Sequence, residues 1–123
     1  MTRNLTLKIY WFYQKALEHV DFIYKITKSF PTREAFALAD QIKRAAVSIC
    51  LNIAEGSGGS KTEFRRFLTI SRRSAREYIA ATEIACRLGF VSPDERQISR
   101  VYCREISKML NGLLKSMQTK GKL

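Results

Sequence analysis

Three short breaks divide this chain into four long runs in which apolar residues recur at intervals of three and four. That spacing places the apolar side chains on one face of an α-helix, and no run shows the alternation typical of a strand. The breaks carry turn signals, namely Pro31, the glycines from Gly56 to Gly59, and Gly89 followed by Pro93. The sequence therefore predicts four helices, at residues 6–29, 33–56, 61–88 and 93–117.

Turns this short leave no room for a crossover connection, so adjacent helices are expected to run antiparallel. The predicted fold class is therefore all-α, an antiparallel up-down-up-down four-helix bundle. A chain of 123 residues can form one domain with a core but is too short for two, so residues 1–123 are expected to be a single domain. No run approaches the roughly 20 apolar residues that cross a bilayer.

The glycine-rich segment AEGSGGSKTEF, residues 54–64, invites comparison with a phosphate-binding loop. A loop of the Walker type requires G-x-x-x-x-G-K-[ST] between a strand and a helix. Counted from Gly56, the second glycine would fall on Lys61, and a predicted helix precedes the segment. A turn accounts for the glycines better, with Gly56 expected at a helix C-cap of positive φ, and Ser60 and Glu63 forming the capping box of the next helix.

The other helix ends carry comparable signals. Ser92 and Glu95 have the spacing of a second capping box, which starts the fourth helix. Thr32 is expected to cap the second helix, and Gly89 is expected to end the third.

Apolar stripes predict which face of each helix forms the core. In the first helix the stripe runs through Tyr13, Leu17, Val20, Tyr24 and Thr27, and is widened by Phe12, Ala16, Ile23, Ile26 and Phe30. In the second it runs through Ala35, Ala39, Ile42, Ala46, Ile49 and Ile53. In the fourth the apolar side contains Ile98, Val101, Glu105, Met109, Leu110, Leu113 and Leu114.

Basic residues outnumber acidic ones by 22 to 11, which gives a net charge of +11 and indicates a polyanionic partner. The third helix concentrates this charge, because five arginines precede its first acid after the helix start, Glu77. Neighbouring like charges cost a few tenths of a kcal/mol per pair in a helix, which favours a nucleic acid against this face. The residues expected to contact phosphates are Arg65, Arg66, Arg72, Arg73 and Arg76, with Arg96, Arg100 and Arg104 of the fourth helix and Lys43 and Arg44 of the second.

The basic surface is compatible with two alternative roles. The chain could be an adaptor whose basic face docks an acidic protein, or the face could simply be solvated. An enzyme is a further class, with Glu55 and Asn52, or Glu77 and Glu83, as acid-base groups. A polar seam between helices or subunits accounts for Asn52 and Glu55 better, so the sequence predicts no enzyme.

Metal sites and nucleophiles have few candidate residues. His19 is the one histidine, and Cys50, Cys86 and Cys103 lack the close spacing of a zinc site. Cys50 and Cys86 fall on apolar stripes, so inert buried thiols are expected. No cofactor or metal is predicted. The free cysteines, with no leader-like segment before the first helix, favour a reducing cytoplasm.

Some apolar residues lie off the core stripes. Val47 and Leu51 lie apart from the stripe of the second helix and indicate contact with another subunit. The aromatic run at residues 10–13 points all around a helix at about 100° per residue, so one or two of its rings must lie outside the core. We expect Trp11 in a subunit interface rather than stacked on a nucleic-acid base.

Two segments of the chain resemble a known family. They are F-P-x-x-E-x-F-x-L-x-x-Q at Phe30–Gln41 and R-A-A-x-S-I-x-x-N-I-A-E-G at Arg44–Gly56. Together with residues 63–90, they resemble the four-helix-bundle proteins encoded by 23S rRNA intervening sequences, over most of the chain. Many relatives have a sequence resembling G-S-x-x-E in the third helix. Residues 73–77 of this chain are R-S-A-R-E, so arginine replaces the small residue.

The same family includes the accessory variability protein Avd of diversity-generating retroelements. The resemblance implies a homopentameric basic barrel that binds nucleic acid and a reverse transcriptase, without enzymatic activity. Arg73, with Arg72 and Arg76, makes this chain more cationic, which favours the Avd-like role over that of an rRNA-linked protein of unknown role. We therefore expect a non-catalytic scaffold for structured RNA or an RNA/DNA duplex, with a reverse transcriptase as a possible further partner.

Overall fold

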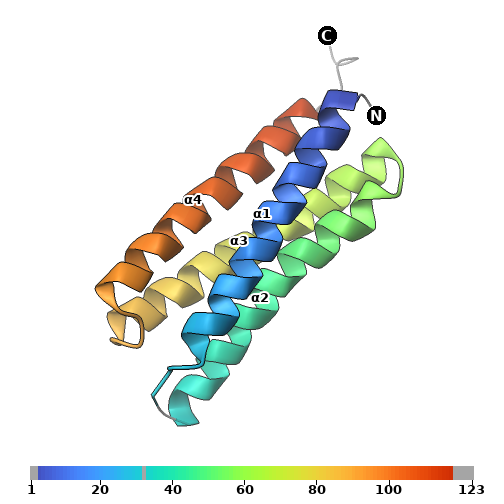
Figure 1. Ribbon diagram of the computed structural model, residues 1–123. Coiled ribbons are helices and arrows are strands. Elements are labelled where there is room, and N and C mark those ends of the chain that lie inside the picture. Colours follow the sequence, from blue (N-terminus) through green and yellow to red (C-terminus); the bar gives the residue numbers. More distant parts are fainter. Residues whose placement is uncertain (1–2, 32, 118–123) are drawn as a thin grey trace.

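The computed structural model describes residues 3–31 and 33–117. Its four helices are α1 (Arg3–Thr27), α2 (Arg33–Ser57), α3 (Lys61–Arg87) and α4 (Pro93–Ser116). They alternate in direction along the bundle, so α1 begins and α4 ends at the same end (Figure 1). Over these residues there is no strand, and no helix has the length and apolar character to span a membrane. The predicted all-α four-helix fold is confirmed, with α1 shifted toward the N-terminus.

Both predicted capping boxes are present. Ser60 Oγ accepts a hydrogen bond from the Glu63 backbone N–H at 3.1 Å, and the Glu63 carboxylate accepts one from the Ser60 N–H at 3.1 Å. Ser92 and Glu95 form the same two bonds, at 3.1 and 2.9 Å. Each box satisfies backbone donors that a helix start leaves unpaired. Thr32, expected to cap α2, lies outside the described residues.

Gly56 and Gly89, which lie near two of the turns, have different structural roles. Gly89 has a φ of 78° and ends α3 as predicted. The expected positive φ at Gly56 is wrong, because among the described residues only Gly89 has one, and α2 continues to Ser57. A Cβ atom on Gly56 would lie 2.7 Å from Phe67 Cβ and 2.9 Å from Phe64 Cδ1. Gly56 is therefore required by the close approach of α2 to α3.

Buried apolar side chains form two clusters along the bundle. One includes Phe12 and Leu110, and the other includes Ile23. On α1, the almost fully buried His19 lies between the residues of the two clusters, and its Nε2 atom is hydrogen-bonded to the Tyr78 hydroxyl. A polar layer thus separates the two halves of the core.

The stripe that α1 buries agrees with the predicted one in part. Tyr24, predicted as core, is 44% exposed, and Tyr13, Leu17 and Val20 are only half-buried. The predicted stripe was therefore centred too far toward one edge of the helix, and it did not include His19. The buried residues of α1 are Ile9, Phe12, Ala16, His19, Ile23, Ile26 and Thr27, five of which were predicted.

The predicted apolar side of α4 also needs correction. Ile98 and Val101 are 46% and 44% exposed, and both line a groove between α4 and α1. A serine takes their place in the core, because Ser99 Oγ lies 3.4 Å from the Tyr78 hydroxyl and so has a polar partner there. The residues that α4 buries are Ser99, Ile106, Leu110 and Leu113.

Candidate nucleic-acid interface

Five arginines of α3 lie off its buried stripe, which runs from Phe64 to Ala85. Arg65, Arg72 and Arg76 recur at i, i+7 and i+11 and follow one edge, while Arg66 and Arg73 lie farther round the helix. Arg65 and Arg72 are half-buried and the other three are exposed. Among the side chains that the structure describes, none of the five forms an ion pair with a carboxylate. We call this set the α3 arginine face.

The arginines of α4 have a different environment. Glu83 of α3 forms ion pairs with both Arg96, at 3.7 Å, and Arg100, at 3.4 Å. Arg104, one turn farther on, is exposed. Residues four apart advance by about 40° around a helix, so this basic row turns away from α3. Its last member, Lys108, lines the groove beside α1.

Lys43 and Arg44 lie near α1 rather than beside the α3 arginine face. Lys43 Nζ lies 5.3 Å from the centroid of the Tyr24 ring, a cation–π distance. Arg44 pairs with Asp40 at 3.6 Å and lines a groove that also contains Tyr24. These two predicted contacts therefore belong to a separate surface of the bundle.

Two polar residues of α4 that the sequence analysis missed lie opposite the α3 arginine face. Ser107 and Asn111 line a cavity of about 70 Å³ together with Arg72 and Arg76. Both are neutral and lie off the basic row of α4, so a search for charge along single helices does not find them. The signal that could have identified them is their spacing of four residues, which places both on one face of α4. Arg72 and Arg76 have the same spacing on α3.

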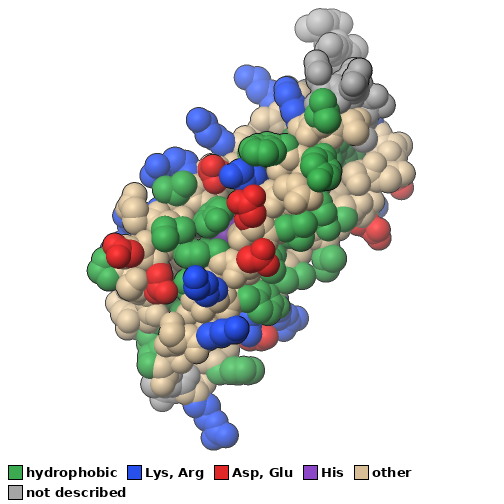
Figure 2. Space-filling view, in the orientation of Figure 1, with side chains coloured by type: hydrophobic (Ala, Val, Ile, Leu, Met, Phe, Trp, Pro, Cys, Tyr) green, Lys and Arg blue, Asp and Glu red, His purple; other side chains and the backbone are tan. Residues whose placement is uncertain are grey.

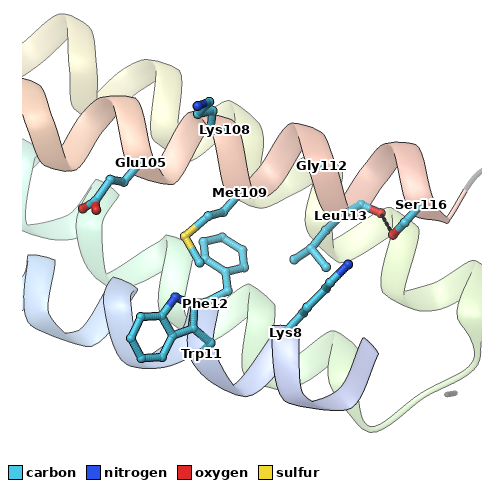
Figure 3. A pocket seen from close by; sticks show the side chains of 9 residues that line it. All are labelled: Lys8, Trp11, Phe12, Glu105, Lys108, Met109, Gly112, Leu113 and Ser116. Carbon is cyan, nitrogen blue, oxygen red and sulfur yellow. Dashed lines mark hydrogen bonds between the residues drawn. The ribbon is translucent and has the colours of Figure 1, made fainter. Parts of the chain in front are cut away.

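Of the adjacent helix pairs, α1 and α4 have the least extensive contact with each other, and a groove runs between them. It encloses about 460 Å³ and is lined by Lys8 and Trp11 of α1 and Lys108 and Met109 of α4, among others (Figure 3). Trp11, predicted at a subunit interface, is 60% exposed. Figure 2 shows hydrophobic side chains gathered along this side of the molecule, with acidic and basic residues among them.

The other two predicted interface residues lie at the opposite edge of α1. Val47 and Leu51 line a groove of about 300 Å³ that α2 forms with Tyr24 of α1. Leu51 is 63% exposed. The structure therefore places the three predicted interface residues in two separate grooves, one on each side of α1.

The aromatic run at residues 10–13 points in several directions, as predicted. Phe12 is fully buried and Tyr13 is half-buried, whereas Tyr10 and Trp11 are exposed. Tyr10 lies in a groove toward Ile53 of α2, and Trp11 lies in the groove toward α4. The two exposed rings therefore face different surroundings.

Comparison with known sequences and structures assigns the chain to a family. A sequence profile described as 23S rRNA-intervening sequence protein matches residues 8–112. The chain belongs to the 23S rRNA-intervening sequence protein family. It is similar to a protein of unknown function from the S23 ribosomal protein family of Bacteroides thetaiotaomicron VPI-5482, with 25% identity and a TM-score of 0.80, over 88% of this chain and 98% of that chain. Curated proteins give no significant match.

The segment Arg44–Gly56 has a structural role in this 23S rRNA-intervening sequence protein. Ser48 Oγ lies 2.8 Å from Ser74 Oγ of α3, and the Asn52 side-chain amide donates to the Ser48 carbonyl at 2.8 Å. These small and polar residues join α2 to α3, the most extensive helix pair. A polar contact between the helices is thus present at Ser48 and Ser74, whereas Asn52 is hydrogen-bonded within α2 and Glu55 is exposed.

The buried titratable groups of this family member are held in their neutral forms. Burial lowers the pKa of His19 to about 3 and raises the pKa of Cys50 and of Cys103 to about 11. Burial also raises the pKa of Cys86, which is half-buried. Thiols that stay protonated at neutral pH are poor nucleophiles, which supports the interpretation of Cys50 and Cys86 as inert.

Proposed function

We propose that this protein is a non-catalytic scaffold that binds nucleic acid through the α3 arginine face. The supporting observation is the contrast between two sets of arginines on the same helix pair. Arg96 and Arg100 share the carboxylate of Glu83, whereas the α3 arginine face has no carboxylate partner among the described residues. A phosphate backbone would supply the missing negative charge and relieve the repulsion between the guanidinium groups.

The chemistry of the face favours shape over sequence. Arginine rows on a helix contact phosphates and sugars, which position a nucleic acid but carry little sequence information. Base-paired RNA and RNA/DNA duplexes are recognised mainly in this way. We therefore propose structured RNA or an RNA/DNA duplex as the ligand.

Assembly into a ring would multiply the α3 arginine face. Trp11 lies in one groove and Val47 and Leu51 in another, on opposite edges of α1. Two different patches on one subunit are what a head-to-tail contact requires, and such contacts form a ring when the rotation from one subunit to the next closes. We propose a cyclic homo-oligomer, with five subunits by resemblance to Avd, and a reverse transcriptase as a further partner on the same ground.

Salt dependence of RNA binding tests the proposal. A labelled RNA hairpin and a DNA hairpin of matched sequence are titrated over a salt series with the wild type and with a variant carrying Arg65→Gln, Arg72→Gln and Arg76→Gln. Each phosphate contact contributes about 0.9 to the slope of log affinity against log salt for duplexes. We expect the triple change to reduce this slope by between two and about three.

A control variant removes the same charge elsewhere. Lys25, Lys28 and Arg33 are exposed and lie in the last turn of α1, after α1, and at the start of α2, at the end of the bundle opposite to the start of α3. Changing all three to Gln should reduce the slope by less than about one, because long-range attraction is screened beyond roughly 10 Å at moderate salt. Equal effects of the two triple variants would contradict a localised interface and leave only general attraction by net charge.

A second candidate function rests on the groove between α1 and α4. Its exposed Trp11 lies among Lys8, Lys15 and Lys108, a combination that suits an apolar segment with acidic flanks. In this alternative the chain is an adaptor for an acidic protein. Nuclease treatment separates the two functions, because an adaptor keeps its protein partner when RNA is destroyed and an RNA-dependent assembly does not.

A further inference from the structure

The cavity between α3 and α4 has the composition of an anion site. Its polar lining consists of Arg72 and Arg76 from α3 and of Ser107 and Asn111 from α4. The buried side chains of Ala75 and Leu110 form its apolar part. Its volume is about 70 Å³. A single water needs roughly 10–15 Å³ of cavity volume of this kind, so the cavity has room for a group of a few heavy atoms. We call it the α3–α4 notch.

Charge balance differs between the notch and the other end of the same helix pair. Seven residues beyond Arg76, Glu83 forms ion pairs with both Arg96 and Arg100, so one carboxylate offsets part of their charge. At the notch the side chains of two arginines, Arg72 and Arg76, line one cavity, and no described carboxylate pairs with either. Where the first site holds a protein carboxylate, the notch therefore lacks an equivalent negative group.

Neutral donors complete the notch from the side of α4. The half-buried Ser107 hydroxyl and the exposed Asn111 amide have no hydrogen-bond partner among the described residues. A hydroxyl and an amide can each donate to an oxygen of an anion. Four side chains that can donate hydrogen bonds therefore line one small space from two helices, which suits an anion with several oxygen atoms.

We propose that the α3–α4 notch binds one phosphate group, supplied by a phosphodiester of the nucleic-acid backbone. The source of the phosphate rests on the proposed function, whereas the site itself rests on the geometry of the notch. Each guanidinium presents a planar fork that matches two phosphate oxygens. Ser107 and Asn111 fix the position of the group, so this phosphate is held at one place while Arg66 and Arg73 contact the backbone without a fixed position.

Titration with a single phosphodiester tests the notch. A dinucleoside monophosphate, which has one diester and no terminal phosphate, is titrated with the full chain at constant ionic strength and observed by phosphorus-31 NMR. A parallel titration uses inorganic phosphate. We expect saturable binding of the diester by the wild type. It should weaken by about tenfold with Arg72→Gln and Arg76→Gln together, since hydrogen bonds to charged groups are lost.

Two further double variants make the test specific to the notch. Ser107→Ala with Asn111→Ala removes donors but no charge and should weaken diester binding by roughly threefold to tenfold. Arg66→Gln with Arg73→Gln removes the same two charges from the same helix but lies outside the notch, and should change it by less than about twofold. Thermal melting followed by circular dichroism confirms that each variant is folded.

Several results would overturn the proposal. The notch is not the site if the wild type does not bind the diester, if the two double-arginine variants weaken binding equally, or if the alanine variant binds like the wild type. Binding of inorganic phosphate without binding of the diester would overturn the assignment to a backbone phosphate and point to a free phosphate ligand.

The same variants separate this inference from the proposed scaffold function. If wild type binds the RNA hairpin while the Arg72/Arg76 and Arg66/Arg73 variants lose affinity equally, the scaffold stands and the notch fails. If the diester binds at the notch while the RNA hairpin does not bind at all, the notch stands and the scaffold fails.

Discussion

His19 is a titratable group held in the middle of the bundle. Its ring stacks on Tyr102, with 4.8 Å between the ring centroids, and its Nε2 atom is hydrogen-bonded to the Tyr78 hydroxyl. Burial lowers the pKa of His19 from 6.5 to about 3. Below pH 6.5, His19 is therefore protonated in the unfolded chain but stays neutral in the folded chain. The free energy of unfolding must fall as the pH drops from about 6.5 toward 3.

This loss of stability gives a prediction at the scale of one residue. Between about pH 6.5 and pH 5, His19 should lower the free energy of unfolding by up to about 1.4 kcal/mol per pH unit. His19→Gln has no titrating group, so its urea unfolding should depend less on pH by that amount. This pH range lies above the ordinary pKa of carboxyl groups, so their titration contributes little to the difference between the two proteins. Equal pH dependence of both proteins would contradict a neutral buried His19.

Gly56 links the residue scale to the helix pair α2 and α3. Gly56→Ala introduces a Cβ atom that would lie 2.7 Å from Phe67 Cβ, which cannot rotate away. We expect overpacking to cost about 1–3 kcal/mol of unfolding free energy in urea. Gly112→Ala is the matched control, because nothing lies within 4 Å of its new Cβ atom and α4 is helical there. Gly112→Ala should raise the free energy of unfolding by about 0.5–1 kcal/mol. Destabilisation of similar size in both variants would rule out the close approach as the cause.

Local signals predicted the helices well and the contacts between them poorly. Capping residues such as Ser60 and Ser92 act within one turn, so their spacing alone identifies them. His19 was missing from the predicted stripe of α1 because the polar partners that make it a core residue come from α3 and α4. Asn111 was missed for the same reason, since its place beside Arg76 depends on how two helices align.

At the scale of the whole molecule, the two grooves flanking α1 give a prediction about assembly. Trp11→Glu should disable one patch and Leu51→Glu the other, so each variant alone should be monomeric. A mixture of the two should form dimers, because each variant keeps the patch that the other lacks. Light scattering after size-exclusion chromatography gives the masses, against about 71 kDa for five chains of 14.2 kDa.

Two outcomes would count against this arrangement. Single variants that keep the mass of the wild type would show that neither groove is an interface. A mixture that stays monomeric would exclude a head-to-tail contact between the Trp11 groove and the Leu51 groove.

The polar layer in the core also determines the register of each helix against its neighbours. Apolar stripes repeat along every helix, and two such stripes can pack in more than one register. Moving α1 by seven residues against α3 would take His19 away from the Tyr78 hydroxyl and leave both polar groups buried among apolar side chains, at a cost of several kcal/mol. Ser99 imposes the same condition on α4. One layer therefore selects a single alignment of three helices, and with it the opposition of Arg72 and Arg76 to Ser107 and Asn111.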